Sequence, residues 1–205
     1  MTTEEILKIL HQDIHTVIMA VNDEEGHPIT CAVDIMLISK EKLFFLTARG
    51  KSLYRRLTSQ KYIACTGIKG VDTLSRCAIS LRGKIRGIGN RLLEEILEAN
   101  PYMKKLYPNQ KAQEQLEVFE LYEYEGEFFD LSQTPLYRTS FSVRRQKVEH
   151  GYFIQNSCVG CGSCTKICPQ SCIDTRQTPY AIIQERCLHC GVCQKYCPHQ
   201  AISCR

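Results

Sequence analysis

Eight cysteines near the end of the chain form two runs of identical spacing, each C-x2-C-x2-C-x3-C-P, and the second run begins 29 residues after the first. Thiolates at this spacing bind iron–sulfur clusters. Zinc also uses C-x2-C pairs, but two repeated runs of four cysteines with a proline after each favour clusters. The runs are Cys158, Cys161, Cys164 and Cys168 before Pro169, and Cys187, Cys190, Cys193 and Cys197 before Pro198.

The repeated runs resemble those of bacterial ferredoxins that carry two [4Fe–4S] clusters. In that family the first three cysteines of each run bind one cluster and the fourth binds the other. The resemblance implies one cluster on Cys158, Cys161, Cys164 and Cys197, and a second on Cys187, Cys190, Cys193 and Cys168. About 55 residues bury too little apolar surface for a stable core. We therefore expect cluster binding to be coupled to folding of this part.

The five remaining cysteines are interpreted as non-ligands. Cys31, Cys65 and Cys77 lie in apolar or strand-like surroundings and are expected to be buried like small hydrophobic residues. Cys172 and Cys204 each follow a run that already supplies four ligands. Because cluster ligands must stay reduced as thiolates, we expect a cytoplasmic protein and an anaerobic setting. His189 and His199 lie in and just after the second run and are expected at the surface.

Composition and charge argue against two classes of partner. The formal net charge is +4, but each oxidised cluster with its four thiolates adds about −2, which brings the total to about zero. We therefore expect no binding to nucleic acid. No apolar run approaches the ~20 residues of a membrane-spanning helix, and the first residues do not read as a signal peptide. We expect no contact with a membrane.

Upstream of the cysteines, short strands alternate with tight turns. Such a pattern indicates a closed or nearly closed antiparallel barrel, mainly β with some α, rather than a βαβ sheet. The predicted organisation is a barrel domain over 1–137, a basic linker over 138–150 and a small α+β two-cluster domain over 151–205. The linker carries Arg138, Arg144, Arg145 and Lys147. Strands are predicted at 15–21, 28–38, 43–47, 62–67, 77–88, 118–124 and 128–131, and helices at 3–11, 51–59 and 91–99.

The turn before the helix at 51–59 has the residue types that a phosphate needs. Gly50 permits a close turn, Ser52 offers a hydroxyl, and Arg49 and Lys51 offer positive charge where helix N–H groups point outward. A lysine at a helix start opposes the helix dipole, which favours a bound anion. The alternative is that Arg49 and Lys51 are solvated charges without a ligand.

This turn and its flanking strands resemble the FMN-binding split barrel of the pyridoxamine 5′-phosphate oxidase-like superfamily. The similarity covers about residues 1–135 and is best over 44–57, the strand at 62–65 and the segment at 79–85. It implies FMN at the interface of a homodimer, with Thr30 on the strand beside the flavin ring. The phosphate residues that it implies are Lys51 and Ser52, then Arg49 and Thr47.

One departure from that superfamily limits the comparison. The chain contains no tryptophan, whereas pyridoxamine oxidases proper hold the substrate phosphate with a tryptophan and an arginine. The chain is therefore not expected to be a pyridoxamine oxidase.

The leading hypothesis is an FMN-dependent reductase. Electrons would pass between an external carrier such as ferredoxin or flavodoxin, the two [4Fe–4S] clusters and FMN, which would reduce a small organic acceptor. A second hypothesis is a non-catalytic electron-transfer or redox-sensing protein that acts only with a protein partner. A third is a barrel that holds haem or a deazaflavin. No residue is identified as catalytic.

Overall fold

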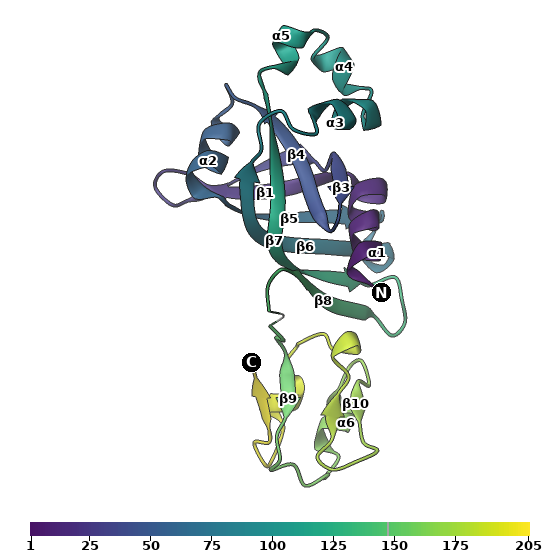
Figure 1. Cartoon of the computed structure of the whole chain (residues 1–205). Coiled ribbons are helices and arrows are strands. Elements are labelled where there is room, and N and C mark those ends of the chain that lie inside the picture. Colours follow the sequence, from purple (N-terminus) through teal and green to yellow (C-terminus); the bar gives the residue numbers. More distant parts are fainter. Residues whose placement is uncertain (147) are drawn as a thin grey trace.

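The computed structural model describes residues 1–146 and 148–205. Figure 1 shows a larger N-terminal part built around a curved sheet and a small C-terminal part beyond β8. Lys147, which belongs to the predicted basic linker, lies outside the described residues. No helix of the described residues is long and apolar enough to cross a membrane.

The N-terminal part is an antiparallel sheet of eight strands. Its order is β2-β1-β5-β6-β7-β4-β3, with β8 paired to β7. The sheet curls into a half-barrel that does not close between the edge strands β2 and β3, which confirms the expected split barrel. The strands are β1 (Thr16–Asn22), β2 (Pro28–Asp34), β3 (Leu37–Ser39), β4 (Lys42–Ala48), β5 (Tyr62–Lys69), β6 (Cys77–Gly87), β7 (Leu116–Asp130) and β8 (Tyr137–Val143).

Helices and short turns cover the sheet. Helix α1 (Thr3–Lys8) begins with a capping box, in which the Thr2 side chain accepts from the Glu5 N–H and the Glu5 carboxylate accepts from the Thr2 N–H. It continues as the π-helix η1 (Ile9–Ile14) and packs Ile6, Leu7 and Leu10 into the core. Later elements are α2 (Ser52–Gln60), the 3-10 turn η2 (Thr73–Ser75), α3 (Leu93–Ala99), α4 (Met103–Leu106) and α5 (Gln110–Gln113).

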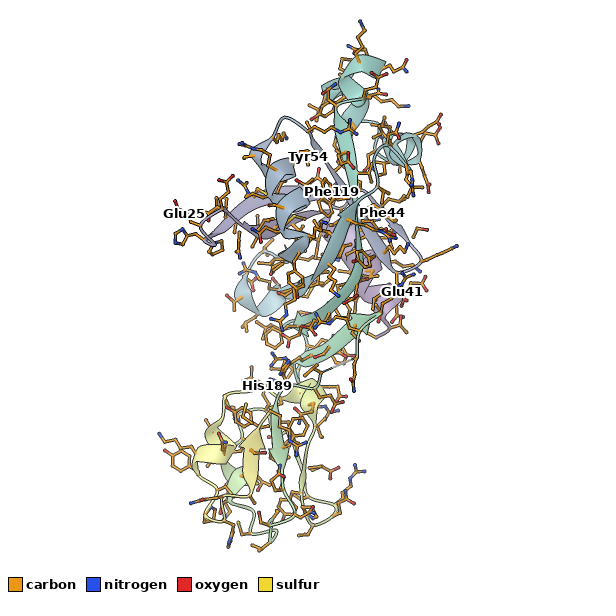
Figure 2. All side chains as sticks on the ribbon, turned by 60° about the vertical axis from the view of Figure 1, so that its left-hand side comes forward. Glu25, Glu41, Phe44, Tyr54, Phe119 and His189 are labelled. Atoms are coloured by element: carbon orange, nitrogen blue, oxygen red, sulfur yellow. The ribbon has the colours of Figure 1, made fainter. Side chains whose placement is uncertain are left out.

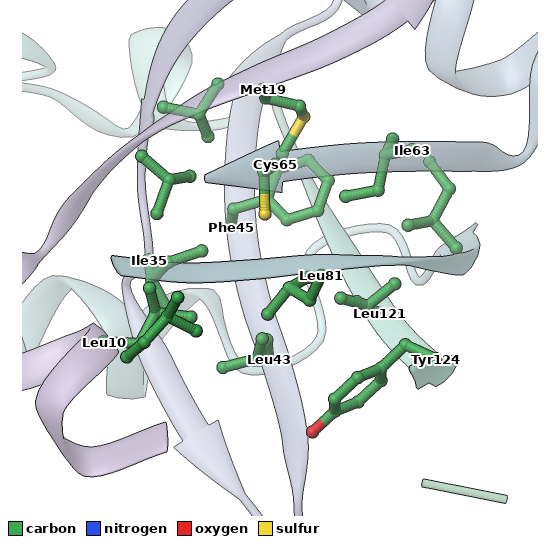
Figure 3. Close-up of a cluster of buried hydrophobic side chains, with 14 of the residues drawn as sticks. Leu10, Met19, Ile35, Leu43, Phe45, Ile63, Cys65, Leu81, Leu121 and Tyr124 are labelled. Carbon is green, nitrogen blue, oxygen red and sulfur yellow. The ribbon is translucent and has the colours of Figure 1, made fainter. Parts of the chain in front are cut away.

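The core lies inside the curve of the sheet (Figure 3). Alternate residues of β1 are buried, among them Met19, while Ile18 points to the outer face and is 54% exposed. The rings of Phe45 and Phe119 stack with centroids 5.7 Å apart. Cys65 is buried as expected, and burial raises the pKa of its thiol to about 12. Cys65 therefore packs in the core as a small hydrophobic residue.

Strand β7 is longer than the sequence predicted. Residues 118–124 and 128–131 were predicted as two strands, but 118–124 and 128–130 lie on one strand, β7, which pairs with β6, β4 and β8. Gly126 lies between them. A Cβ there would stand 2.6 Å from the Phe141 ring and 2.7 Å from the Ser80 carbonyl oxygen. The glycine is a point of close strand packing, not a turn.

The linker prediction is wrong for residues 138–143. They belong to β8, which pairs with β7 from Tyr137↔Asp130 to Val143↔Tyr124. Side chains at the end of β8 alternate between the two faces of the sheet, and Phe141 and Val143 are buried in the core. Arg138 is therefore fixed on a strand at the end of the barrel.

The C-terminal part is built from two similar halves. The pairs β9–β12 and β10–β11 are antiparallel. Each half has a short helix that follows a glycine at positive φ, Gly162 at 77° and Gly191 at 73°. The elements are β9 (Tyr152–Ile154), α6 (Ser163–Ile167), β10 (Ile173–Asp174), β11 (Ala181–Ile182), the 3-10 turn η3 (Gln184–Arg186), α7 (Val192–Lys195) and β12 (Ile202–Cys204).

Candidate redox site

The eight repeated cysteines line two separate cavities. Both are narrow, with volumes of about 20 Å³ and 10 Å³. Each cavity takes three cysteines from one run and the fourth cysteine from the other, which is the crossed arrangement of two-cluster ferredoxins. Their assignment as ligands stays a prediction. The first cavity has Cys158, Cys161, Cys164 and Cys197, and the second has Cys187, Cys190, Cys193 and Cys168.

The arrangement of donors at these sites suits clusters better than single ions. Within residues 1–146 and 148–205, no group of three or more His, Cys, Asp or Glu side chains is arranged to hold one metal ion. A structural zinc site would bring four ligands to about 2.0–2.3 Å from one point. Each cavity instead gathers four cysteines drawn from both runs, which is the donor set of a [4Fe–4S] cluster, so the residues present fit the group.

Cys172 is a fifth cysteine at the second cavity. It is 2% exposed, and its Sγ lies 3.4 Å from that of Cys168. In the repeat, the corresponding position holds Ala201. The interpretation of Cys172 as a non-ligand stays a prediction.

The predicted phosphate residues lie at the start of α2. Lys51 is the N-cap of this nine-residue helix, and no side chain caps its first turn. Lys51, Ser52 and Gly50 are exposed, and nothing lies within 4 Å of where a Gly50 Cβ would stand. Thr47 is the second-last residue of β4, just before this turn, and its Oγ1 is buried without a hydrogen-bond partner among the residues that the structure describes. An uncapped helix start beside an unpaired buried hydroxyl fits a phosphate group.

Arg49 stands apart from the other three residues. Its Nε and Nη2 donate to the Glu117 carboxylate at 3.1 and 3.0 Å. Glu117 also accepts from the Gly89 N–H at 2.7 Å. The charge of Arg49 is therefore balanced by β7, and its place in a phosphate site stays a prediction.

Sequence reasoning missed Arg56, which lies one turn after Ser52 on α2. Arg56 is half-buried, and its Nε is buried without a hydrogen-bond partner. Burial raises the pKa of the Cys31 thiol on β2, and Arg56 and Lys51 oppose that rise. Both cations therefore lie near β2. Residues four apart lie on the same side of a helix, so the spacing of Ser52 and Arg56 could have identified Arg56 from the sequence.

Thr30 lies on the outer face of the sheet, which we define as the face turned away from the core. It pairs with Ala20 on β1, Ala20 pairs with Ala64 on β5, and the row continues to Arg82 on β6 and Glu125 on β7. Neighbouring strands are about 4.8 Å apart. Thr30 and Ala64 are therefore about 10 Å apart across the strands.

The outer face also meets the C-terminal part, at a contact that we call the junction. Arg138 donates to the Glu127 carboxylate through Nε at 2.7 Å and to the Cys187 carbonyl oxygen through Nη1 at 3.5 Å. His189, between two cysteines of the second cavity, lies on this side (Figure 2). It was expected at the surface, but its Nε2 is buried, with no hydrogen-bond partner in residues 1–146 and 148–205. Burial and the charge of Arg138 lower the pKa of His189.

A pocket of about 330 Å³ opens at the junction. The sheet contributes the outer-face positions Ala64, Thr66 and Ser80, and the C-terminal part contributes His189. Charged groups in its wall occur as pairs, Arg82 with Glu125 at 2.8 Å and Arg138 with Glu127. Apolar wall residues are Leu81, Phe141 and Val148. No residue lines both this pocket and either cysteine cavity, and the pocket meets the second run through His189.

Comparison with family models assigns the cysteine module. The model for a 4Fe-4S dicluster domain matches residues 157–201. This stretch is a 4Fe–4S dicluster domain. The eight repeated cysteines all lie within it, and β9 adds a strand before it by pairing with β12. A search of curated proteins gives no match to the chain.

The N-terminal part is similar to solved split barrels. A NimC/NimA family protein from Clostridium acetobutylicum shares 17% identity at a TM-score of 0.57, over 69% of this chain and 92% of that one. A protein of the pyridoxinephosphate oxidase family, related to general stress protein 26 and also from C. acetobutylicum, shares 16% at 0.52, over 69% and 96%. A haem-binding protein from Mycobacterium smegmatis shares 14% at 0.54, over 69% and 58%. These similarities establish the fold of the barrel.

Proposed function

We propose that this protein is a cytoplasmic flavin- and iron–sulfur-dependent oxidoreductase. Electrons pass between an external one-electron carrier, two [4Fe–4S] clusters and FMN, and a small organic acceptor is reduced. One observation carries the proposal. The dicluster domain contacts the barrel through Arg138 and His189, on the outer face that also holds Thr30 of the expected flavin strand.

The start of α2 supplies the phosphate site for the flavin in this proposal. Lys51 and Ser52 at the uncapped start of α2 would hold the phosphate, and Arg56 would direct its unpaired Nε to it. The buried hydroxyl of Thr47 would donate to the same group or to the adjoining ribityl chain. Bound FMN would take up electrons singly and deliver them in pairs.

The junction pocket is our proposed site for the small acceptor. Its arginines are neutralised by glutamates, so no net charge selects an anion or a cation. Its lining combines apolar side chains with hydroxyls and imidazoles. An uncharged planar molecule with polar edge atoms fits these features best. Such a molecule would lie between the dicluster domain and the outer-face row that leads to Thr30.

The external carrier would meet the cluster held by Cys158, Cys161, Cys164 and Cys197, which lies away from the junction. The junction reaches the second run through Cys187 and His189, whereas Val159 beside the first cavity is 60% exposed. A carrier such as ferredoxin or flavodoxin would reach this side without displacing the barrel. Electrons would then enter at the first cluster and leave from the second.

A homodimer is part of the proposal. The outer face of β1, β2 and β5 exposes apolar side chains beside small ones, among them Ile18 at 54% and Ile68 at 54%, next to Ala32 and Ala64. Exposed apolar side chains gathered on one face of a sheet are typical of an interface. A second copy placed there would enclose a flavin ring beside Thr30.

An absorption spectrum of anaerobically prepared protein tests the cofactor set. We expect flavin bands close to those of free FMN on top of the broad iron–sulfur absorption. A Soret band instead would support the haem alternative, which the fold of the M. smegmatis protein motivates, and would refute the flavin. Stopped-flow mixing of reduced protein with a panel of small acceptors then tests the enzyme. Rapid reoxidation by a carrier protein but by no small acceptor would support the non-catalytic alternative.

A further inference from the structure

Arg138 lies between a barrel carboxylate and a cysteine of the second cluster site. Two donors on one edge of its guanidinium, Nε and Nη2, reach Glu127 at 2.7 and 2.6 Å. Nη1, on the other edge, points to the Cys187 carbonyl oxygen at 3.5 Å. The Arg138 side chain is only 20% exposed and lies over the Phe129 ring at 5.5 Å. The ion pair is therefore oriented, with its positive end toward the cluster site.

The duplicated half has no such contact. Cys158 corresponds to Cys187 in the repeat, and its backbone N–H donates within the domain, to the Gln155 carbonyl oxygen at 3.0 Å. Throughout residues 1–146 and 148–205, no arginine or lysine side chain donates to Cys158. The two halves carry the same ligand types, so the barrel itself makes their electrostatic surroundings unequal.

The sign of the effect follows from charge. A reduced cluster carries one more negative charge than an oxidised one, so a nearby cation stabilises the reduced form and raises the reduction potential. Partial burial limits screening of the interaction by water and salt. The carboxylate of Glu127 opposes the cation but lies on its far side.

We propose that Arg138, oriented by Glu127, raises the reduction potential of the cluster held by Cys187, Cys190, Cys193 and Cys168. An electron on the dicluster domain is thereby drawn toward the cluster that faces the barrel. Arg138 is a positioning residue that acts through Cys187. The inference depends on the two clusters and on the barrel residues Arg138 and Glu127, and it holds whether the barrel binds flavin, haem or neither.

We call the cluster of Cys158, Cys161, Cys164 and Cys197 cluster one, and the other cluster two. Cluster one has a weaker interaction of its own. The Ser163 hydroxyl lies 3.4 Å from the Cys161 Sγ, and the repeat has Val192 at the corresponding position. A neutral hydrogen bond to a ligand sulfur also raises a potential. The variant Ser163→Ala should therefore lower the potential of cluster one alone. It serves to assign the two potentials.

The test is a redox titration followed by EPR on the full-length protein with both clusters loaded. We expect Arg138→Gln to lower the potential of cluster two relative to that of cluster one by about 59 mV. For a one-electron couple this shifts the equilibrium of the electron between the two clusters about tenfold toward cluster one. Glu127→Gln removes the opposing charge and should shift cluster two upward. Arg138→Lys keeps the charge and should retain most of the wild-type difference.

Arg82→Gln is the matched control. It removes an arginine from another arginine–glutamate pair on the same face, one that makes no hydrogen bond to the dicluster domain. It should leave both potentials unchanged. Since loss of a structural contact would move Arg138→Gln and Glu127→Gln in the same direction, opposite shifts identify an electrostatic effect. Equal shifts of both clusters, shifts of the same sign in the two variants, or no shift in Arg138→Gln would overturn the proposal.

Discussion

Arg56 offers the sharpest test of the flavin site, because the chain provides its own control. Arg55 and Arg56 are adjacent on α2, and both carry the same charge. Arg55 is exposed, whereas Arg56 is half-buried with an unpaired Nε. Replacing each by glutamine separates a general loss of positive charge from the loss of one directed donor.

The expected size of the effect follows from one hydrogen bond. A hydrogen bond to a charged group contributes about 1.5–3 kcal/mol, and each 1.4 kcal/mol is about tenfold in affinity. Arg56→Gln should therefore weaken FMN binding by about 10- to 100-fold. Arg55→Gln should weaken it by less than about threefold, as expected for an exposed charge screened by salt.

Titration of flavin-free protein with FMN, followed by quenching of flavin fluorescence, measures both affinities. Thermal unfolding of the same flavin-free samples is the second readout. Arg56→Gln should not lower the unfolding temperature, because its buried Nε has no partner to lose. Equal affinities of the two variants would refute the reasoning. A clear loss of flavin-free stability in Arg56→Gln would assign Arg56 to the fold and not to the ligand.

Three further predictions concern the clusters and the outer face. Cys197→Ser, although it lies in the second run, should remove the cluster of Cys158 and about halve the iron content; Cys204→Ser should keep both clusters, and normal iron in Cys197→Ser would contradict the crossed ligation. Removal of iron by a chelator should expose the amides of residues 151–205 to rapid hydrogen exchange while the barrel stays protected; protection that persists in both parts would show a core that does not need clusters. Ile18→Lys should convert a dimer to a monomer in sedimentation, whereas Leu74→Lys, at an exposed turn, should not; a wild-type monomer would exclude the proposed interface.

The sequence alone predicted the features that depend on local spacing. The two cysteine runs predict the dicluster domain, because the cluster fixes the spacing of its ligands. The start of α2 was also visible, since Gly50 and Ser52 mark a turn into a helix. In both cases neighbouring residues carry the whole signal.

The features that were missed depend on contacts between distant segments. Arg55 and Arg56 look equivalent until α2 packs on the sheet and buries only one of them. The dense charge over 138–147 favoured a linker, although Phe141 and Val143 already alternate with serines as in a strand. His189 reads as a surface residue until β8 brings the barrel against it. The exposure and charge pairing of residues at the junction depend on packing between distant segments. A local sequence pattern does not predict such packing.

The most direct test of the central claim is intramolecular electron transfer between the clusters and the flavin. Protein with both cofactor types is mixed anaerobically with a reduced carrier protein, and cluster bleaching and flavin reduction are followed together by stopped-flow absorbance. We predict that the clusters bleach first and that the flavin is reduced afterwards, at a rate independent of carrier concentration. Protein depleted of iron should show much slower flavin reduction. Flavin reduction at the same rate without clusters would contradict the account.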